Sequence, residues 1–564
     1  MVLAVSPAVA SFSGTAAAIG TRSSGGLGIA VRRAESETRL YFRRGISLVL
    51  SCCPDVSRSS HLHHVDPVVS SRGFSSSEGR SVPTCSASQE VAATAESAVA
   101  GEVTQFSELA QAKVLSIVGA GSVSPFNGNS WEDVMRHMAQ RIGFIDTNFE
   151  MLVLTEEAFL AEGKEFDADV AIVIAVRDVE VAEQLQKRYL QNVPTLVSFD
   201  SAPNFETRLG SLKVKPVDQV EKMLGSFPGS KRKDAMKVLS LVEEAWERKS
   251  SDDVRFALLV LIDSYVTPVT LLKNLRATSL ASVQCMVKNC RSQILSCILD
   301  PNCRQALNCL QSCAPTDQVC SYRCIVSYES EKLEAFTLCV LQKHNCLGLS
   351  ADILMQPDVQ PMKLFRGNPV THEIAEDLFI GWLGRPNPDS LATPLKYSWR
   401  VVAGQNAAYD QFPCQFQIFY RGKAKGSMWY DPVFQVQTLD GKLVWRRRHY
   451  RVKRDVVPGT FYFTVLDNGV ISKEFWRIVD VKDDLSWGLF YYSGAAAAAG
   501  QSYTGAILVT QDGSWPPESE AIRLNSALDK CGIKVWELYR VNNAGCSNPP
   551  LSIPEGSSLH SVIT

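Results

Sequence analysis

Ten of the sixteen cysteines in this 564-residue chain lie in one short stretch, between Cys285 and Cys346. Cysteines gathered this densely predict a module held by cross-links rather than by a large apolar core. Zinc is the alternative, but the stretch has no Cys-x2-Cys pair and a single histidine, His344. We therefore expect disulfide bonds, no metal, and an oxidising compartment.

The cysteine spacing favours one set of pairings but leaves many other connectivities open. Cys309-x3-Cys313 and Cys320-x3-Cys324 each place two sulfurs on one helix face, and two such helices can run antiparallel. Their bonds would then nest, and the four cysteines before them have similar spacing. The pairs predicted are Cys309–Cys324 around Cys313–Cys320, Cys285–Cys303 around Cys290–Cys297, and Cys339–Cys346.

The first 100 residues are composed like a targeting sequence. They contain no lysine, and up to Cys85 nine arginines accompany five acidic residues among serine, alanine and glycine. This Arg-rich, Ser-rich and acid-poor composition is typical of a transit peptide, with an ordinary disordered tail as the alternative. We predict that residues 1–100 are a transit peptide and a disordered region, in which Cys52, Cys53 and Cys85 have no structural role.

Length and charge narrow the class of protein. A chain of 564 residues exceeds one compact core, so several domains are expected. The formal net charge of −2 argues against nucleic acid as a partner, because binding to phosphates needs a basic face. No charge-free run of 18 apolar residues occurs, so we expect no membrane-spanning helix. The sequence does not indicate an oligomeric state.

Residues 103–280 predict an α/β domain with trailing helices. Apolar strand candidates, beginning with Lys113–Val118, alternate with helical patterns, which is typical of a parallel sheet. Gly119-Ala-Gly121 follows that strand and suggests a dinucleotide-binding turn. The fingerprint's third glycine is replaced by Ser124, and its acidic residue, Glu156, comes too late in the sequence. A nucleotide cofactor is therefore disfavoured.

Residues 388–546 predict a β-barrel, because apolar residues there alternate with period two. Eight up-and-down strands, a helix at Glu518–Lys530 and a last short strand near Val535 indicate a lipocalin-type barrel that can hold one apolar ligand. The strand candidates are Trp399–Ala403, Cys414–Tyr420, Phe434–Thr438, Lys442–Tyr450, Thr460–Leu466, Phe475–Val479, Trp487–Tyr492 and Thr504–Thr510.

The expected fold class is thus multidomain α+β: an N-terminal α/β domain, a disulfide-rich helical module at 281–350, a lipocalin-type eight-stranded barrel, and a tail at 547–564. A bond between Cys414 and Cys546 could staple the barrel, which leaves Cys531 unpaired.

Three sequence blocks resemble one known family. They are Tyr409-Asp-Gln-Phe-Pro-Cys414, Asn543-Ala-Gly-Cys546, and the block from Val287-Lys-Asn-Cys290 through Asn308-Cys-Leu-Gln-Ser-Cys313. A cysteine-rich helical module followed by a barrel with these motifs resembles the violaxanthin de-epoxidase family, most closely its "related" branch. The resemblance covers roughly residues 280–550.

The resemblance implies an enzyme and a site. The family reduces a xanthophyll epoxide with ascorbate in the chloroplast xanthophyll cycle, in the thylakoid lumen or at the membrane surface. Matching the motifs places the catalytic acid at Glu474 and the catalytic tyrosine at Tyr492. Residues expected to line the substrate site are Gln415, Trp476 and Asp410. A carboxylic acid in an apolar barrel suits the task, because burial keeps its proton available to the epoxide oxygen.

Departures from the family keep other hypotheses open. Where the family carries histidines and acids thought to sense acidity, this chain has residues such as Pro413 and Gln417, and His449 is the only histidine of the barrel. A histidine-based pH switch is therefore not expected. The second hypothesis is a non-catalytic lipocalin that binds a carotenoid or lipid. The third makes the α/β segment a nucleotide-dependent partner of the barrel.

Overall fold

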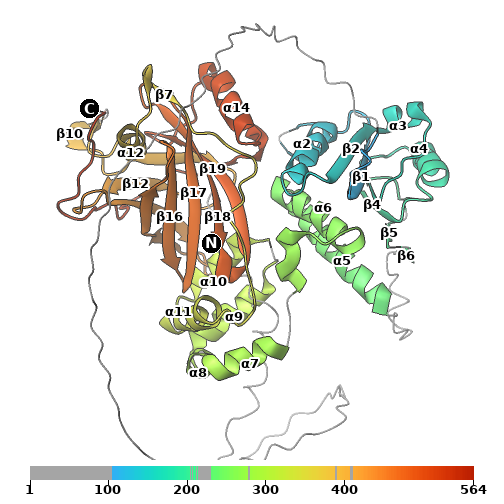
Figure 1. Cartoon of the computed structure of the whole chain (residues 1–564), viewed down its shortest axis with the longest axis horizontal. Helices are drawn as coiled ribbons and strands as arrows, with labels where there is room; N and C mark the ends of the chain where they lie inside the picture. The colour runs from blue at the N-terminus through green and yellow to red at the C-terminus, as the bar shows by residue number, and fades with distance from the viewer. Residues whose placement is uncertain are drawn as a thin grey trace, which may run out of the picture. The chain divides into compact units, whose positions relative to one another are not determined.

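The computed structural model describes residues 105–563, except 127, 204, 206, 211, 214–229, 277–279, 315, 388–389 and 407–410. The predicted transit segment and Asp410 lie outside the described residues. Along the chain follow an α/β sheet, a helical cysteine module and a β-barrel, which confirms the predicted fold class (Figure 1). Among the residues that are described, no helix has both the length and the apolarity needed to cross a membrane.

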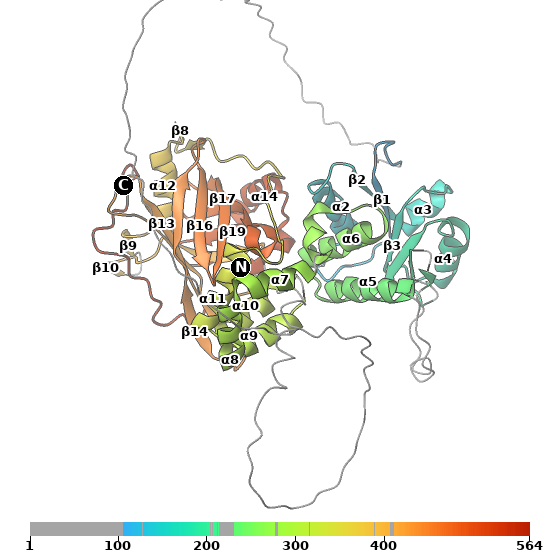
Figure 2. The ribbon, with the colours of Figure 1, turned by 60° about the horizontal axis from the view of Figure 1, so that its bottom comes forward.

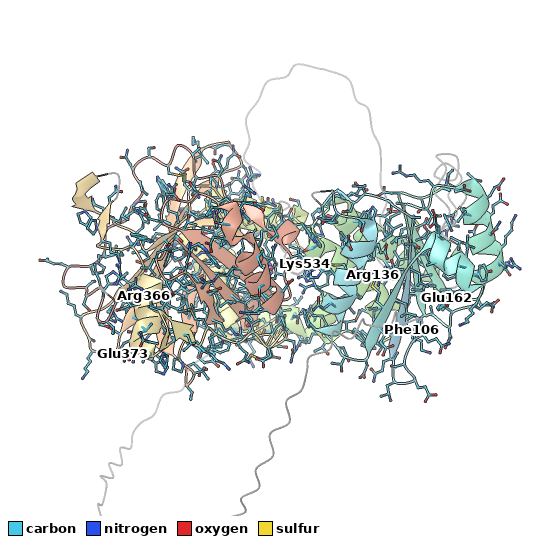
Figure 3. All side chains as sticks on the ribbon, turned by 90° about the horizontal axis from the view of Figure 1, so that it is seen from above. Phe106, Arg136, Glu162, Arg366, Glu373 and Lys534 are labelled. Atoms are coloured by element: carbon cyan, nitrogen blue, oxygen red, sulfur yellow. A yellow bond between two sulfur atoms is a disulfide. The ribbon has the colours of Figure 1, made fainter. Side chains whose placement is uncertain are left out.

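A parallel sheet forms the N-terminal part. Its elements are β1 (Ala112–Val118), α2 (Trp131–Gly143), β2 (Phe149–Thr155), α3 (Glu156–Glu162), β3 (Val170–Ile174), α4 (Val179–Gln184), η2 (Leu185–Tyr189), β4 (Thr195–Phe199), β5 (Arg208–Leu209), β6 (Leu212–Lys213), α5 (Ser230–Glu247), α6 (Ser251–Tyr265) and η3 (Thr270–Arg276). The strand order is β2-β1-β3-β4, continued by the antiparallel β5 and β6. Every residue of β3 is buried, as expected for a strand covered on both faces. Arg136, labelled in Figure 3, forms an i,i+4 ion pair with Glu132 on the exposed side of α2.

Short helices build the cysteine module (Figure 2). They are α7 (Leu280–Asn289), α8 (Arg291–Leu299), α9 (Pro301–Ser312), α10 (Gln318–Ser327), α11 (Glu331–Thr337) and the π-helical η4 (Leu338–Lys343). Capping side chains fix three of their starts: Asp300, Asp317 and Ser330 each accept a hydrogen bond from a backbone N–H in the first turn.

The disulfide pairing agrees only in part with the prediction. The pairs Cys309–Cys324, Cys313–Cys320 and Cys414–Cys546 are confirmed, and Cys531 is a buried free thiol. The predicted pairs Cys285–Cys303, Cys290–Cys297 and Cys339–Cys346 are wrong. In their place the structure has Cys285–Cys346, Cys290–Cys339 and Cys297–Cys303.

The wrong pairs came from joining cysteines that are close in sequence. In the structure α11 and η4 fold back, because Phe336 and Val340 share one apolar core with Met286 and Ile294. This return brings the last two cysteines of the module to the first two. The bonds Cys285–Cys346 and Cys290–Cys339 therefore join the beginning of the module to its end.

Eight antiparallel strands close the barrel, each paired with the next and the last with the first. They are β11 (Trp399–Gly404), β12 (Phe416–Arg421), β13 (Met428–Gln437), β15 (Tyr450–Arg454), β16 (Thr460–Asp467), β17 (Val470–Val481), β18 (Trp487–Ala496) and β19 (Gln501–Thr510). The strand predicted at Lys442–Tyr450 is broken in two: β14 (Leu443–Arg447) and β15 pair with successive parts of β13.

The segments around the barrel are short. They are β7 (Leu364–Phe365), β8 (Asn368–Pro369), α12 (His372–Ile380), β9 (Pro386–Asn387), β10 (Ser390–Pro394), η5 (Ala497–Ala499), η6 (Glu518–Glu520), α14 (Ala521–Lys530), η7 (Val535–Glu537) and β20 (Tyr539–Arg540). The strand predicted near Val535 is instead the 3-10 turn η7, and the strand β20 that follows pairs with β11.

Helix α12 closes one end of the barrel. Phe379 is fully buried, and its ring centroid lies 4.7 Å from that of Phe419 and 4.9 Å from that of Phe490. The indole N–H of Trp399 donates to the carbonyls of Leu378 and Phe379 at 3.0 Å, which fixes the end of the helix. This end of the barrel interior is thus filled by aromatic rings in stacked and edge-to-face contact.

The cysteine module covers the opposite end. Tyr322 of α10 packs on Phe412 of the β11–β12 loop, with ring centroids 5.4 Å apart. Arg323 donates to the carbonyl of Gln437 at the end of β13, and Thr337 to that of Asn468 between β16 and β17. Ala499, between β18 and β19, shares the apolar core of the module. The module therefore contacts each strand connection at this end.

The C-terminal segment, residues 547–563, packs along the barrel wall. Ser558 pairs with Arg421 at the end of β12. Asp377 of α12, which is fully buried, accepts hydrogen bonds from the backbone N–H groups of Ser561, Val562 and Ile563. Burial alone would raise the pKa of Asp377, but these donors and Arg421 outweigh it, so its pKa lies below the ordinary value.

We expect Asp377→Asn to lower the free energy of unfolding by about 2 kcal/mol at pH 7, because hydrogen bonds to a charged acceptor are lost. A carboxyl with a lowered folded-state pKa contributes stability above its unfolded pKa and loses it as pH falls. The difference from the wild type should therefore shrink below pH 4. Urea unfolding at both pH values measures it, with the exposed Asp529→Asn as control. An equal stability of Asp377→Asn and wild type at pH 7 contradicts this role.

Candidate functional site

A buried carboxyl group lies inside the barrel on β17. Glu474 is 1% exposed, and strand alternation places it on the same face as Trp476 and Ile478, which belong to the barrel core. Its cross-strand neighbours are Phe463 on β16 and Gly494 on β18. The surroundings of this acid are therefore aromatic and apolar.

Two side chains hold the carboxyl group of Glu474. The indole Nε1–H of Trp476 donates to Oε2 at 2.7 Å, and the hydroxyl of Tyr503 on β19 donates to Oε1 at 2.7 Å. Trp476 is itself sandwiched, with ring centroids 4.7 Å from Phe463 and 5.0 Å from Tyr492. The acid is thus fixed by two donors, and the ring of one of them, Trp476, is held by stacking.

Burial governs the acidity of this group. Desolvation raises the pKa of Glu474 above the ordinary carboxyl value, while the bonds from Trp476 and Tyr503 and the charge of Arg448 act in the opposite direction. A carboxylic acid in such a place keeps its proton to higher pH than an exposed one. It can therefore donate a proton to a basic oxygen that enters the barrel.

Two glycines make room for the tyrosines. A Cβ on Gly494 would lie 2.5 Å from Cζ of Tyr503, and a Cβ on Gly505 would lie 2.5 Å from the hydroxyl oxygen of Tyr492. Because a side chain at Gly494 would displace the Tyr503 ring, the glycine of Tyr491-Tyr-Ser-Gly494 is what lets Tyr503 reach Glu474. Each ring lies across the backbone of the neighbouring strand.

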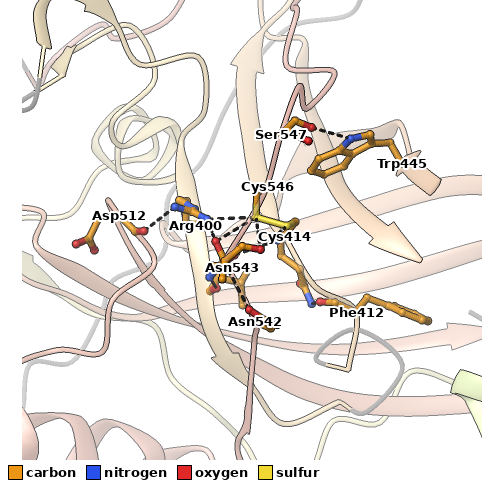
Figure 4. The surroundings of a disulfide bond; sticks show 12 residues. Arg400, Phe412, Cys414, Trp445, Asp512, Asn542, Asn543, Cys546 and Ser547 are labelled. Carbon is orange, nitrogen blue, oxygen red and sulfur yellow. Dashed lines mark hydrogen bonds between the residues drawn. A yellow bond between two sulfur atoms is a disulfide. The ribbon is translucent and has the colours of Figure 1, made fainter. Parts of the chain in front are cut away.

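The structure brings three of the predicted site residues together. Glu474, Trp476 and Tyr492 form one contiguous group, in which Tyr492 stacks on Trp476. Gln415 is buried beside the barrel disulfide, where its side-chain amide donates to the carbonyl of Phe412 at 2.9 Å (Figure 4). Asp410 lies outside the described residues.

Two further residues of the site were not predicted from the sequence. Tyr503 needs the β18–β19 register, which pairs it with Gly494 and so aims it at Glu474. Arg448, at the break between β14 and β15, is 6% exposed and forms an ion pair with Asp467 at 2.9 Å. Its guanidinium lies 4.6 Å from the ring centroid of Tyr322, which joins the cysteine module to the mouth of the barrel.

We expect Gly494→Ala to move Tyr503 away from Glu474 and so to raise the pKa of Glu474 further, since a bond that favours the carboxylate is lost. Tyr503→Phe removes the same bond without added bulk and should shift the pKa in the same direction. The infrared C=O band of the protonated carboxyl, followed against pH, reports the change. Gly488→Ala on the same strand is the control, because its Cβ would contact the side chain of Val481 at 3.3 Å and not that of Tyr503. An unchanged titration in both test variants contradicts the arrangement.

Comparisons with known proteins agree with this architecture. Residues 282–543 match the family model described as the VDE lipocalin domain. The chain is similar to the chloroplastic violaxanthin de-epoxidases of Spinacia oleracea, 25% identical over 48% of this chain and 53% of that protein, and of Arabidopsis thaliana, 23% identical over 48% and 55%. It spans about half the length of the curated relatives it matches.

Solved lipocalin-like structures are more distant. The siderocalin Ex-FABP matches with a TM-score of 0.21 and 10% identity, covering 26% of this chain and 93% of its own. Lobster apocrustacyanin A1 matches with a TM-score of 0.20 and 11% identity, covering 26% and 76%. Likenesses at this level say nothing about function. The family model and the curated relatives agree on the segment: residues 282–543, a little under half of this chain, are similar to the VDE lipocalin domain.

Proposed function

We propose that the chain reduces the epoxide of a violaxanthin-like xanthophyll, with Glu474 as the proton donor. The observation that carries this proposal is the buried carboxyl group with a raised pKa in an aromatic barrel. Tyr492, stacked on Trp476 in the same group, is the proposed hydrogen-bonding partner of the substrate. Gln415, Trp476 and Asp410 remain proposed substrate-binding residues.

The proposed reaction removes the epoxide oxygen as water. Glu474 donates a proton to that oxygen as its C–O bond opens, and a second proton and two electrons complete the conversion to a carbon–carbon double bond. Ascorbate, the proposed reductant, supplies the two electrons and becomes dehydroascorbate. As a glutamate, Glu474 carries its proton one methylene farther from the strand than an aspartate would.

We place the reaction in the chloroplast, since the relatives are chloroplastic proteins. Six disulfide bonds among the described residues favour an oxidising compartment, which supports the proposed thylakoid lumen or thylakoid membrane surface. An apolar xanthophyll would reach the barrel from that membrane.

One observation favours a second candidate, a non-catalytic lipocalin that binds a carotenoid or lipid. Both carboxylate oxygens of Glu474 already accept a hydrogen bond from the protein, from Trp476 and Tyr503. A buried polar group satisfied in this way can serve packing alone. In this case the barrel would hold its ligand without changing it.

Turnover separates the two candidates. Purified protein with intact disulfides is incubated with violaxanthin-loaded lipid vesicles and ascorbate from acidic to neutral pH, and pigments are resolved by chromatography. If the chain is the enzyme, we expect the epoxide to be consumed, at a rate that declines as pH rises through the raised pKa of Glu474. Pigment that copurifies but is never converted supports the second candidate, and no conversion at any pH rejects the first for this substrate.

A further inference from the structure

Helix α8 of the cysteine module carries apolar residues on two opposite sides. Ile294 and Cys297 are buried in the core of the module. At about 3.6 residues per turn, Leu295 and Leu299 lie on the other side of the helix, one turn apart. Their side chains are 50% and 79% exposed. Because a helix that is apolar all round is normally covered on every side, the outer face of α8 indicates a docking surface.

The charged residues around these leucines are positive. Arg291 lies one turn before Leu295 on the same stripe of α8, and Lys288 lies in the last turn of α7. Arg304 of α9 donates to the carbonyl of Ile298 at 3.4 Å, which brings this guanidinium to the end of α8. All three cations are exposed, and none of them forms an ion pair with a described residue. The leucine stripe is therefore flanked by positive charges.

The helices α7, α8 and α9 contain a single acidic residue, Asp300. Its carboxylate is used inside the module, where Oδ1 accepts the backbone N–H of Cys303 at 2.6 Å and the hydroxyl of Ser330 at 2.9 Å. The exposed acids that follow in the sequence, Glu331 and Glu334, belong to α11, which packs on the buried side of α8. The outer face of α8 is thus both apolar and positively charged.

We propose that this face, with Lys288, Arg291 and Arg304 around Leu295 and Leu299, docks on a lipid bilayer that contains anionic headgroups. Apolar side chains that enter the headgroup region and cations that attract anionic lipids are the two parts of such a surface. A second copy of the chain fits the face less well. A symmetric contact would place the same cations opposite one another, and like charges across an interface repel.

The inference deepens the proposed function and rests on it for one point, that the apolar substrate lies in a membrane. The module contacts the end of the barrel through α10 and α11, where Arg323 and Thr337 donate to strand connections. The outer face of α8 therefore stays exposed while the module covers the barrel. Vesicle binding is measured without pigment or ascorbate, so a failure of docking and a failure of turnover are distinguishable.

Cosedimentation of the full chain with lipid vesicles tests the proposal. Vesicles of phosphatidylcholine are compared with vesicles of equal parts phosphatidylcholine and phosphatidylglycerol at low salt. The chain should bind the anionic vesicles at least tenfold more tightly, and added salt should weaken this binding because it screens the cations. Equal affinity for the two kinds of vesicle, or no binding to the anionic ones, overturns the proposal.

Variants locate the surface on α8. Arg291→Gln and Arg304→Gln should each weaken binding to the anionic vesicles about fivefold, the contribution of one cation near an anionic surface. The double variant Leu295→Gln, Leu299→Gln should weaken it about tenfold, because two apolar side chains no longer enter the bilayer. All four side chains point away from the core, and thermal melts verify that each variant folds.

Matched controls come from another exposed helix. Ile522→Gln and Lys530→Gln on α14 change an exposed apolar residue and an exposed cation, and both should bind like the wild type. Unchanged binding in the α8 variants would place lipid binding elsewhere, for instance in the arginine-rich residues 1–100, and overturns the proposal. A dimer seen by light scattering that the double leucine variant dissociates would assign the face to a second copy and likewise overturns it.

Discussion

Replacing Glu474 with glutamine is expected to lower the rate of epoxide reduction by about 10²–10⁴-fold, the contribution of a positioned general acid. Glutamine keeps the size of the side chain, and its amide oxygen can still accept the bond from Trp476. The hydroxyl of Tyr503 can turn to accept from the amide N–H. Any loss of rate thus reports the missing proton rather than a collapsed site. The measurement is the initial rate at saturating ascorbate over a range of pH.

A matched control and a stability readout accompany this variant. Glu518→Gln changes an exposed carboxyl beyond the barrel and should keep full activity. Burial raises the folded-state pKa of Glu474, so the free energy of unfolding should fall as pH rises through that pKa, because the buried group must then carry a charge. The wild type should therefore lose stability toward neutral pH more steeply than Glu474→Gln. Full activity in Glu474→Gln removes the residue from the mechanism.

Removing the ring of Phe379 should destabilise the barrel by about 3–5 kcal/mol, as truncation of a buried phenylalanine leaves a cavity. Phe379 has no exposed surface and touches rings from both sides of the barrel, among them Phe419 and Phe490. Guanidinium unfolding of Phe379→Ala, followed by tryptophan fluorescence, measures the change.

The comparison for Phe379 is an aromatic residue on the outer face. Tyr462 of β16 is 40% exposed and stacks on its cross-strand neighbour Phe475. Tyr462→Ala should therefore cost about 1 kcal/mol, which is the usual size of an exposed-ring contact. Similar losses in the two variants would show that α12 does not close the barrel as described.

Period-two patterning and cysteine spacing were enough to predict the fold class. The barrel strands and the α9–α10 pairs follow from local rules, because alternation and i,i+4 spacing act within a few residues. The bond Cys414–Cys546 spans 132 residues and was predicted because the two cysteines stand near the first and last strands of the barrel. Cys290 and Cys339 could not be paired this way. Their contact depends on α11 returning to α8, which is decided by apolar packing between segments far apart in sequence.

The same contrast between local patterns and long-range packing applies to the residues of the candidate site. Glu474 and Trp476 are two residues apart on one strand, so alternation alone places them on one face. Tyr503 reaches Glu474 across two strand pairings, and only the register reveals that Gly494 leaves it room. Glu156 is also placed by register: it follows Gly121 by a long stretch of sequence, yet the parallel pairing of β1 and β2 brings it to the backbone N–H of Ala120.

The position of the outer disulfides has a consequence for proteolysis. Cys285 and Cys346 bracket nearly the whole cysteine module, and Cys414 and Cys546 bracket nearly the whole barrel. A single cut inside either bracket leaves both fragments covalently joined, so the protein keeps its mass on a non-reducing gel and separates only after reduction. A cut between residues 347 and 413 lies outside both loops, and there alone could one protease event detach the module from the barrel.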